Sequence, residues 1–174
     1  MKKNKKMLAI KNDLLYNCSG TKWGLVGKGV ITMFMGEYRF NIDEKGRLFI
    51  PAEFRKDIGT SVVVSCGIEK CLTIYTLDSW KKYVDKIETL VATKKANREY
   101  KRLMMSRAYE KEIDAKGRVK IESTQVIYAS LTKECVVLGS GAYIEIWDKT
   151  EWEKYLSDHL STLEELSEGI EFDE

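Results

Sequence analysis

The sequence predicts an α+β fold in which two tandem copies of one supersecondary unit pack into a single small β-barrel with flanking helices. One observation is a repeated turn, Asp-x-Lys-Gly-Arg, at residues 43–47 and again at 114–118. A second is that glycine and aromatic positions recur 72 residues later: Gly67, Tyr75, Trp80 and Tyr83 match Gly139, Trp147, Trp152 and Tyr155. A third is that neither copy has enough strands to hide its sheet edges, so one pseudo-two-fold domain is the simplest arrangement.

The first predicted element is a strand. Tyr38, Phe40 and Ile42 alternate with polar neighbours at the two-residue period of a half-buried strand, and Leu48 and Ile50 resume the pattern after the turn. We therefore expect the two strands to form a β-hairpin.

Four residues are predicted to shape the two turns. The aspartate at the start of each turn can accept backbone N–H bonds from the residues that follow it, and the glycine supplies a positive φ that a side chain would resist. The turn-structuring residues are therefore Asp43, Gly46, Asp114 and Gly117.

A short helix and a second hairpin are expected next. Pro51 is placed to open a helix over residues 52–58, because the first helical position needs no N–H. Residues 62–65 and 72–75 are the strands of the second hairpin. Asp78 or Ser79 then caps a helix with apolar residues at three-and-four spacing, namely Trp80, Tyr83, Val84, Ile87, Leu90 and Val91.

The second copy repeats this plan. Its expected strands are residues 136–138 and 143–147, and Thr150 is its expected helix cap. Its helical stripe contains Trp152, Tyr155, Leu156, His159, Leu160 and Leu163. Glu122 occupies the position of Pro51, so the short helix of the second copy is expected to begin differently.

The chain divides into five predicted segments. They are an N-terminal extension at 1–32, repeat 1 at 37–79, an inter-repeat helical segment at 80–107, repeat 2 at 108–151, and a C-terminal helix with an acidic tail at 152–174.

The extension holds seven lysines and one acid, and its apolar stretch at residues 7–10 is too short for a signal peptide. One interpretation is a mis-assigned start, with translation beginning at Met33; the other is a genuine basic arm. No apolar run approaches the ~18–20 residues that span a bilayer, so we expect a cytoplasmic protein without a membrane partner.

Catalysis and metal binding are not indicated. The chain has no Cys-x-x-Cys, and its only histidine, His159, lies on an apolar helical stripe, which favours a core position. Cys66, Cys71 and Cys135 align with apolar residues of the sister repeat, which favours structural thiols, whereas Cys18 lies outside the repeats. We expect no catalytic residue, no metal and no cofactor.

Charge is unevenly distributed, although the net charge is only +2. The tail from Glu164 to Glu174 has six acids and no base. The inter-repeat segment sets six cations against Glu99: Lys94, Lys95, Arg98, Lys101, Arg102 and Arg107. A solvated helix face is the plainer interpretation of that segment.

The two turns are the candidate DNA-binding site. Glycine lets the backbone approach DNA, Lys45 and Lys116 supply point charges for phosphate, and Arg47 and Arg118 can read guanine bidentately. The alternative is that each arginine only pairs with the aspartate four residues earlier. The two interpretations coexist if the aspartate holds the arginine in place.

Several of these segments closely resemble the MraZ family, bacterial regulators built of two SpoVT-AbrB-type repeats. The resemblance rests on Met33–Tyr38, on both Asp-x-Lys-Gly-Arg turns, on Pro51–Arg55 and on the ending Gly169–Asp173. It covers the chain from about Met33 to Glu174. Two departures are Phe40, where members often have histidine, and Glu122.

The resemblance implies a sequence-specific transcription factor with a double-split or swapped-hairpin barrel, associated with the nucleoid. It implies a ring-shaped homo-oligomer that binds double-stranded DNA at short direct repeats upstream of its own operon, in a cluster of division and cell-wall genes. The family's DNA-contacting Asp-x-x-x-Arg signature maps onto Asp43 with Arg47 and onto Asp114 with Arg118. Competing hypotheses are an assembly or adaptor module without specific DNA binding and, third, an enzyme or ligand sensor.

Overall fold

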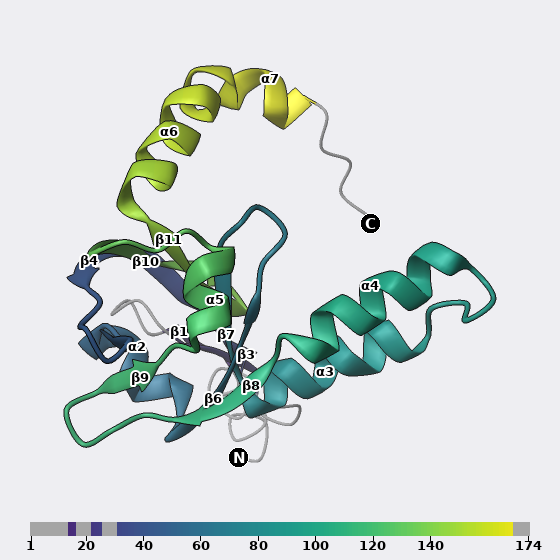
Figure 1. Ribbon diagram of the computed structural model, residues 1–174, viewed down its shortest axis with the longest axis horizontal. Coiled ribbons are helices and arrows are strands. Elements are labelled where there is room, and N and C mark those ends of the chain that lie inside the picture. Colours follow the sequence, from purple (N-terminus) through teal and green to yellow (C-terminus); the bar gives the residue numbers. More distant parts are fainter. Residues whose placement is uncertain (1–13, 17–21, 26–30, 169–174) are drawn as a thin grey trace, which may run out of the picture.

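The strands of the computed structural model, which describes residues 14–16, 22–25 and 31–168, are antiparallel throughout their pairings (Figure 1). From edge to edge, the largest sheet consists of β4 (Phe34–Asn41), β10 (Glu134–Gly141), β11 (Tyr143–Asp148), β7 (Leu72–Thr76), β6 (Ser61–Cys66) and β8 (Tyr109–Glu112). A ribbon pairs β5 (Arg47–Phe49) with β9 (Arg118–Lys120), and a separate sheet contains β1 (Leu14–Tyr16), β2 (Lys22–Leu25) and β3 (Ile31–Thr32). The predicted α+β class is confirmed, and the ladders of these described strands do not close into a barrel.

The helices occupy equivalent places in the two repeats. The short helices are α2 (Ala52–Ile58) and α5 (Ser123–Tyr128), and the last strand of each repeat leads into α3 (Leu77–Glu88) or α6 (Lys149–His159). The chain then diverges, because α4 (Lys95–Ser106) folds back along α3, whereas α6 continues through η1 (Leu160–Thr162) into α7 (Leu163–Glu168). In Figure 1 the α3–α4 hairpin and the C-terminal helices project from the sheets as two separate arms.

The two repeats exchange strands. The first strand of each repeat pairs with the third strand of the other, β4 with β10 and β8 with β6. Exchanging the repeats reverses the strand order of the large sheet without altering it, so a pseudo-two-fold axis passes between β7 and β11, where Thr73 lies opposite Glu145. Each repeat therefore obtains part of its backbone hydrogen bonding from the other.

The predicted hairpin between the first two strands is wrong. The turn itself closes, since the Asp43 N–H donates to the Arg47 carbonyl oxygen at 3.0 Å. The strands then separate: β4 joins the large sheet through β10, and β5 joins β9. Local spacing correctly predicts the turn, but the flanking strands take their ladder partners from the sister repeat.

The core lies between the large sheet, the ribbon and helices α2 and α5. Phe54 of α2 is fully buried, and its ring contacts Phe34 at 5.3 Å and Tyr38 at 5.2 Å between centroids. Leu48 of β5 and Val119 of β9 close the opposite side and are also fully buried. Both repeats thus contribute to one continuous core.

The opposite face of the large sheet carries two aromatic clusters. Tyr75 stacks on Tyr83 of α3 at 5.5 Å, and Trp147 contacts Tyr155 of α6 at 5.2 Å. These pairs occupy equivalent positions in the two repeats, which accounts for the aromatic repetition in the sequence. They anchor α3 and α6 to the sheet.

The short helices and the second hairpin of each repeat confirm the sequence predictions. Helix α2 has the predicted bounds, although Pro51 is its N-cap and not its first helical residue. Strands β6 and β7 pair, as do β10 and β11. Helix α5 begins differently, as expected, with the Glu122 N–H donating to Gln125 Oε1 at 3.3 Å.

The predicted caps of the two long helices are wrong by two residues. Thr76 caps α3 by accepting from the Ser79 N–H at 3.0 Å, and Asp148 caps α6 by accepting from the Thr150 N–H at 2.9 Å. In both repeats the last residue of the strand also serves as the helix cap, so the chain passes from strand to helix without a linker.

The thiol prediction is confirmed and the histidine prediction is wrong. Cys66, Cys71 and Cys135 are buried free thiols, and burial raises the pKa of Cys71 to about 12 and that of Cys135 to about 11. Cys18 lies outside the described residues. His159 is exposed at the end of α6, where it stacks on Tyr155 with ring centroids 4.2 Å apart, because the core ends before this turn of the helix. No described helix is long and apolar enough to cross a membrane.

Candidate nucleic-acid interface

Both Asp-x-Lys-Gly-Arg turns have the same backbone geometry. Asp43 Oδ1 accepts the backbone N–H groups of Lys45 and Arg47, each at 3.0 Å. Asp114 Oδ1 does the same for the second turn, with both distances at 2.9 Å. Gly46 and Gly117 adopt φ values of 73° and 79°. One carboxylate oxygen and one left-handed glycine therefore define each turn.

The second carboxylate oxygen holds the arginine. Asp43 Oδ2 lies 2.7 Å from both Nε and Nη2 of Arg47. Asp114 Oδ2 lies 2.9 Å from Nε and 2.7 Å from Nη2 of Arg118. These arginine hydrogen bonds are the largest cause that lowers the pKa of each aspartate to about 2. Both ion pairs are consequently formed at neutral pH.

The two turns are also linked to each other. Arg118 Nη1 lies 3.7 Å from Asp43 Oδ2, so the second arginine reaches the aspartate of the first turn. The Arg118 guanidinium also lies over the Phe49 ring, 5.8 Å from its centroid. The Arg118 side chain is 15% exposed and that of Arg47 is 33% exposed. The first arginine is thus more accessible than the second.

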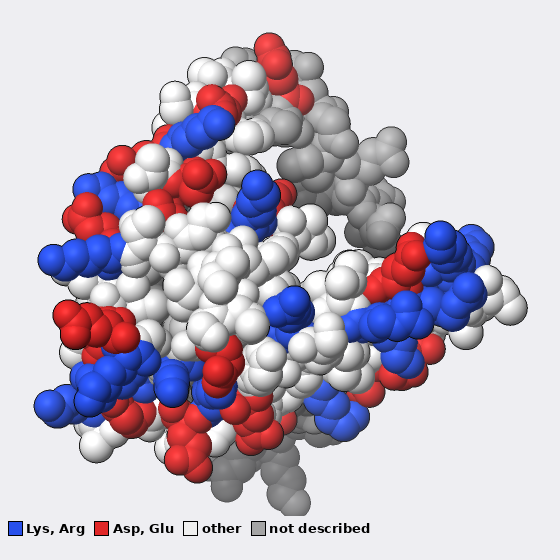
Figure 2. All heavy atoms as spheres, in the orientation of Figure 1, with Lys and Arg blue, Asp and Glu red and all other residues white. Residues whose placement is uncertain are grey.

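The β5–β9 ribbon brings the turns to one surface. Its register pairs Leu48 with Val119, and both side chains point into the core. The alternate positions point outward and carry three cations and one aromatic ring: Arg47, Arg118, Lys120 and Phe49. Figure 2 shows Lys and Arg side chains, with acidic ones beside them, at the lower left, over the region of α2 and β9 in Figure 1.

The lysines of the turns lie at the edges of this surface. The side chains of Lys45 and Lys116 are exposed, as is that of Lys120 on the ribbon. They differ from the arginines in that neither turn lysine has an ion pair with another described residue. The surface therefore combines two arginines held by aspartates with flexible cations around them.

Arg55 is a cation of this surface that the sequence interpretation did not identify as a site residue. From α2 it donates through Nη1 to the Lys116 carbonyl oxygen at 3.3 Å. A Cβ on Gly117 would lie 1.8 Å from the same nitrogen, so glycine is needed for this approach. The sister repeat has apolar Val126 and Ile127 at the corresponding positions. Nothing in the repeat pattern could have indicated this contact.

Comparison with protein families follows the same two units. A family model described as "MraZ protein, putative antitoxin-like" matches residues 33–103 and again residues 104–171. This chain belongs to the MraZ family. The two consecutive matches agree with an MraZ protein of two repeats, and MraZ proteins are regulator-like proteins and not an enzyme family.

The basic inter-repeat segment of this MraZ-family chain has a structural role. Arg98 donates through Nη1 to the carbonyl oxygens of Ala92 and Thr93 at 2.9 and 2.8 Å, which fixes the α3–α4 connection. Lys101 pairs with Glu88 across the hairpin at 2.6 Å. Several cations of this segment thus stabilise the hairpin itself, in agreement with the plainer interpretation of the segment.

Within the described part of this MraZ-family chain, no group of three or more His, Cys, Asp or Glu side chains is placed to hold a metal ion. The structured polar groups near the turns are the two aspartates and the arginines that they bind. Their geometry is suited to presenting cations to an anionic partner.

Replacing Arg47 with alanine is expected to raise the pKa of Asp43 from about 2 toward its ordinary value of 3.8, because the Arg47 side chain is the largest cause of the depression. The pKa of Asp114 should stay near 2, since Arg118 remains. NMR titration of the aspartate carboxyl carbons measures both values in one sample.

The sign of the stability change follows from this shift. A carboxylate with a lowered folded-state pKa stabilises the fold above pH 3.8 and loses that contribution as the pH falls toward about 2. The wild-type chain should therefore lose stability more steeply than Arg47→Ala across this interval. An unchanged Asp43 pKa in the variant would show that the backbone N–H groups, and not the arginine, set it.

Proposed function

We propose that this MraZ-family protein is a sequence-specific DNA-binding transcriptional regulator that acts on promoter repeats of its own division and cell-wall gene cluster. The observation that carries the proposal is the β5–β9 ribbon, which places both Asp-Arg pairs on one surface. The major groove of B-DNA admits a two-stranded β-ribbon. The outward face of this ribbon is cationic, as an interface with phosphate-flanked base edges requires.

The arginines are suited to reading bases because the aspartates hold them without using all of their donors. A guanidinium has five N–H donors, and Nε and Nη2 of Arg47 each direct one toward Asp43. Three donors remain, on Nη1 and on the outer side of Nη2, in the fork that matches guanine O6 and N7. The aspartate fixes the side chain before DNA arrives, which reduces the entropy cost of binding.

Lys45, Lys116 and Arg55 are proposed to contact phosphate. The two lysines are exposed at equivalent turns and lie beside the arginines. Arg55 lies over the second turn only, so that turn carries an extra cation. Phosphate contacts of this kind set position and affinity, whereas the arginines supply sequence preference.

We further propose the finer architecture that the family implies. The exchange of β4 and β8 between repeats supports a swapped-hairpin, double-split barrel. The protein is proposed to assemble into a ring-shaped homo-oligomer on short direct repeats of double-stranded DNA, in the cytoplasm and on the nucleoid. No cofactor or catalytic step is part of this function.

The second candidate is an oligomeric adaptor module without specific DNA binding, which the Asp-Arg pairs would serve purely as structural ties. A salt titration on the gene's own promoter DNA separates the two. A DNA-binding regulator loses affinity by about 0.9 log units per log unit of salt for each neutralised phosphate. An adaptor forms no specific complex at any salt concentration.

Arg47→Ala and Arg118→Ala are each expected to weaken operator binding by about 1–3 kcal/mol per lost base contact, with fold and assembly retained. Fluorescence anisotropy on operator and scrambled DNA measures the loss. Lys45→Ala is the matched control, which should weaken both DNAs equally and reduce the salt slope by about 1.

Two results would contradict base reading by these arginines. Equal weakening on operator and scrambled DNA would assign them to phosphate. Thermal unfolding of either variant at the assay temperature, followed by circular dichroism, would show that the ion pairs serve the fold alone. Arg118→Ala is the more sensitive case, because Arg118 contacts both aspartates.

Binding is expected to depend on several operator repeats. One pair of turns is a small contact, but identical pairs on an assembled ring raise one another's effective concentration when the DNA repeats match the subunit spacing. Affinity measured on fragments with one, two and three repeats should rise sharply from the first to the second. Equal affinity for all fragments would exclude this multivalent mechanism.

A chain that starts at Met33 is expected to keep operator preference and ring size, because the family match and the described turns lie after residue 32. Anisotropy and native mass spectrometry compare it with the full chain. If residues 1–32 form a basic arm, truncation lowers the salt slope on all DNA alike. Loss of specific binding, with Met1 found at the native N-terminus, would overturn the expectation.

A further inference from the structure

The equivalent helices α3 and α6 differ in what covers them. Helix α4 packs along α3, with the Tyr83 and Tyr100 hydroxyls 2.6 Å apart and Met104 buried between hairpin and sheet. Helix α6 instead continues into η1 and α7, where Leu160 is 65% exposed and Leu163 is 61% exposed. We name η1 and α7, residues Leu160–Glu168, the C-terminal arm. This arm presents leucines that its own chain leaves uncovered.

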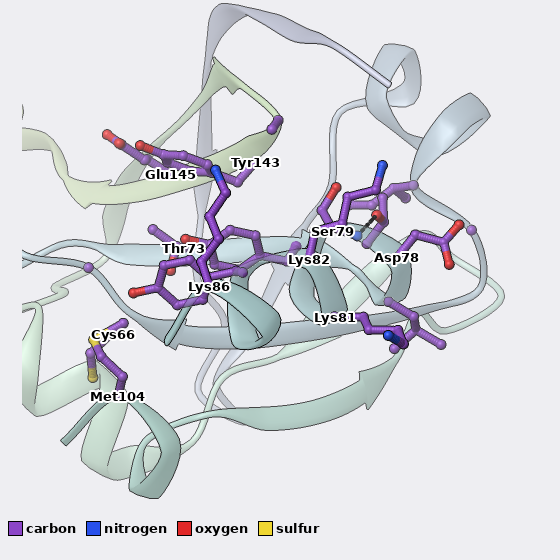
Figure 3. Close-up of a pocket in the computed structure, with 18 of the residues that line it drawn as sticks. Cys66, Thr73, Asp78, Ser79, Lys81, Lys82, Lys86, Met104, Tyr143 and Glu145 are labelled. Atoms are coloured by element: carbon purple, nitrogen blue, oxygen red, sulfur yellow. Dashed lines mark hydrogen bonds between the residues drawn. The ribbon is translucent and has the colours of Figure 1, made fainter. Parts of the chain in front are cut away.

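A groove runs along α3 on the same face of the large sheet. Its volume is about 1630 Å³, and it lies between α3, the outer sides of β7 and β11, and the β6–β7 loop (Figure 3). Small-molecule pockets typically measure roughly 300–1,000 Å³, so this groove is of a size for a polypeptide segment. Tyr75, Tyr83 and Tyr143 give it an aromatic floor, and the exposed Ile68 lies at one end.

Charge distinguishes the groove from the arm. Lys81, Lys82 and Lys86 of α3 line the groove, and Figure 3 shows Lys86 beside Tyr143 and Glu145 of β11. Lys81 pairs with Asp85 at 3.0 Å, whereas Lys82 and Lys86 have no ion pair with another described residue.

The arm and tail have the opposite charge. From Glu164 to the end, the sequence has six acids and no base. Glu165 is exposed on α7. Pairing two arms would bring like charges together, which opposes association, whereas an arm in the groove brings acids to lysines. Apolar and charge matching therefore favour the same occupant.

We propose that the C-terminal arm of one chain docks in the α3 groove of a second copy. Leu160 and Leu163 then pack on the tyrosine floor, and the acidic residues that follow lie against Lys82 and Lys86. Arm and groove are different surfaces, so the contact is head-to-tail and joins copies into a closed ring or an open chain. This inference rests on the proposed self-assembly and assigns its interface.

The test uses the full chain without DNA, in native mass spectrometry and size-exclusion chromatography with light scattering. The arm variant is Leu160→Lys with Leu163→Lys, and the groove variant is Lys82→Glu with Lys86→Glu. Ile127→Lys is the control, since Ile127 is 77% exposed on α5 and belongs to neither surface. All these side chains are exposed, and equal melting temperatures verify the fold.

We expect the wild type and the control to assemble, and each double variant alone to lose assembly by more than about tenfold in dissociation constant. An equal mixture of the two double variants should form a heterodimer that stops at two chains. The arm variant supplies an intact groove and the groove variant supplies an intact arm, so a single good contact remains.

The other outcomes overturn the inference. A groove variant that assembles like the wild type would indicate arm–arm pairing, and a mixture without heterodimers would exclude the head-to-tail contact. A monomeric wild type would place the arm in its own groove or in solvent. DNA binding is measured separately on a single operator repeat, so a monomer that binds it contradicts only this interface, and an assembled ring that binds no DNA contradicts only the regulator proposal.

Discussion

The antiparallel pairing of β5 with β9 is the constraint on which the candidate site depends. Its centre is the buried pair Leu48 and Val119, which are equivalent residues of the two repeats. An antiparallel ladder centred on equivalent residues places the two preceding turns on the same outer face. The position of both arginines therefore follows from burying one apolar residue per repeat in a shared core. DNA-facing geometry and core packing are consequences of the same three-residue strands.

Within this symmetric frame the two turns have diverged. Arg118 contacts both aspartates and lies over Phe49, whereas Arg47 is bound to Asp43 alone in its close contacts. Arg55 adds a cation to the second turn only. The second turn is accordingly the more rigid and more basic of the two, and the first has the more accessible guanidinium. A pseudo-symmetric surface of this kind has a direction along DNA.

Local features of the fold could be predicted from the sequence because their causes are local. The Asp-Gly turns and α2 follow from residue types within a few positions. Partner choice could not be predicted, since alternation shows that a strand is half-buried but not which strand it joins. The caps Thr76 and Asp148 were missed because they are also strand ends. Within the site, repetition indicated the four turn cations, whereas Arg55 has no counterpart in the sister repeat.

The divergence beyond the repeats explains how a duplicated chain can acquire polarity. Covering α3 with α4 leaves a groove on repeat 1, and omitting that cover on α6 leaves an arm on repeat 2. A two-fold dimer presents its reading surfaces in opposite directions and suits palindromic half-sites. Head-to-tail copies present every turn pair in the same direction, which suits direct repeats. The asymmetric parts of the fold thus favour the same operator arrangement that the family membership suggests, and they do so through physical surfaces remote from the DNA-facing ribbon.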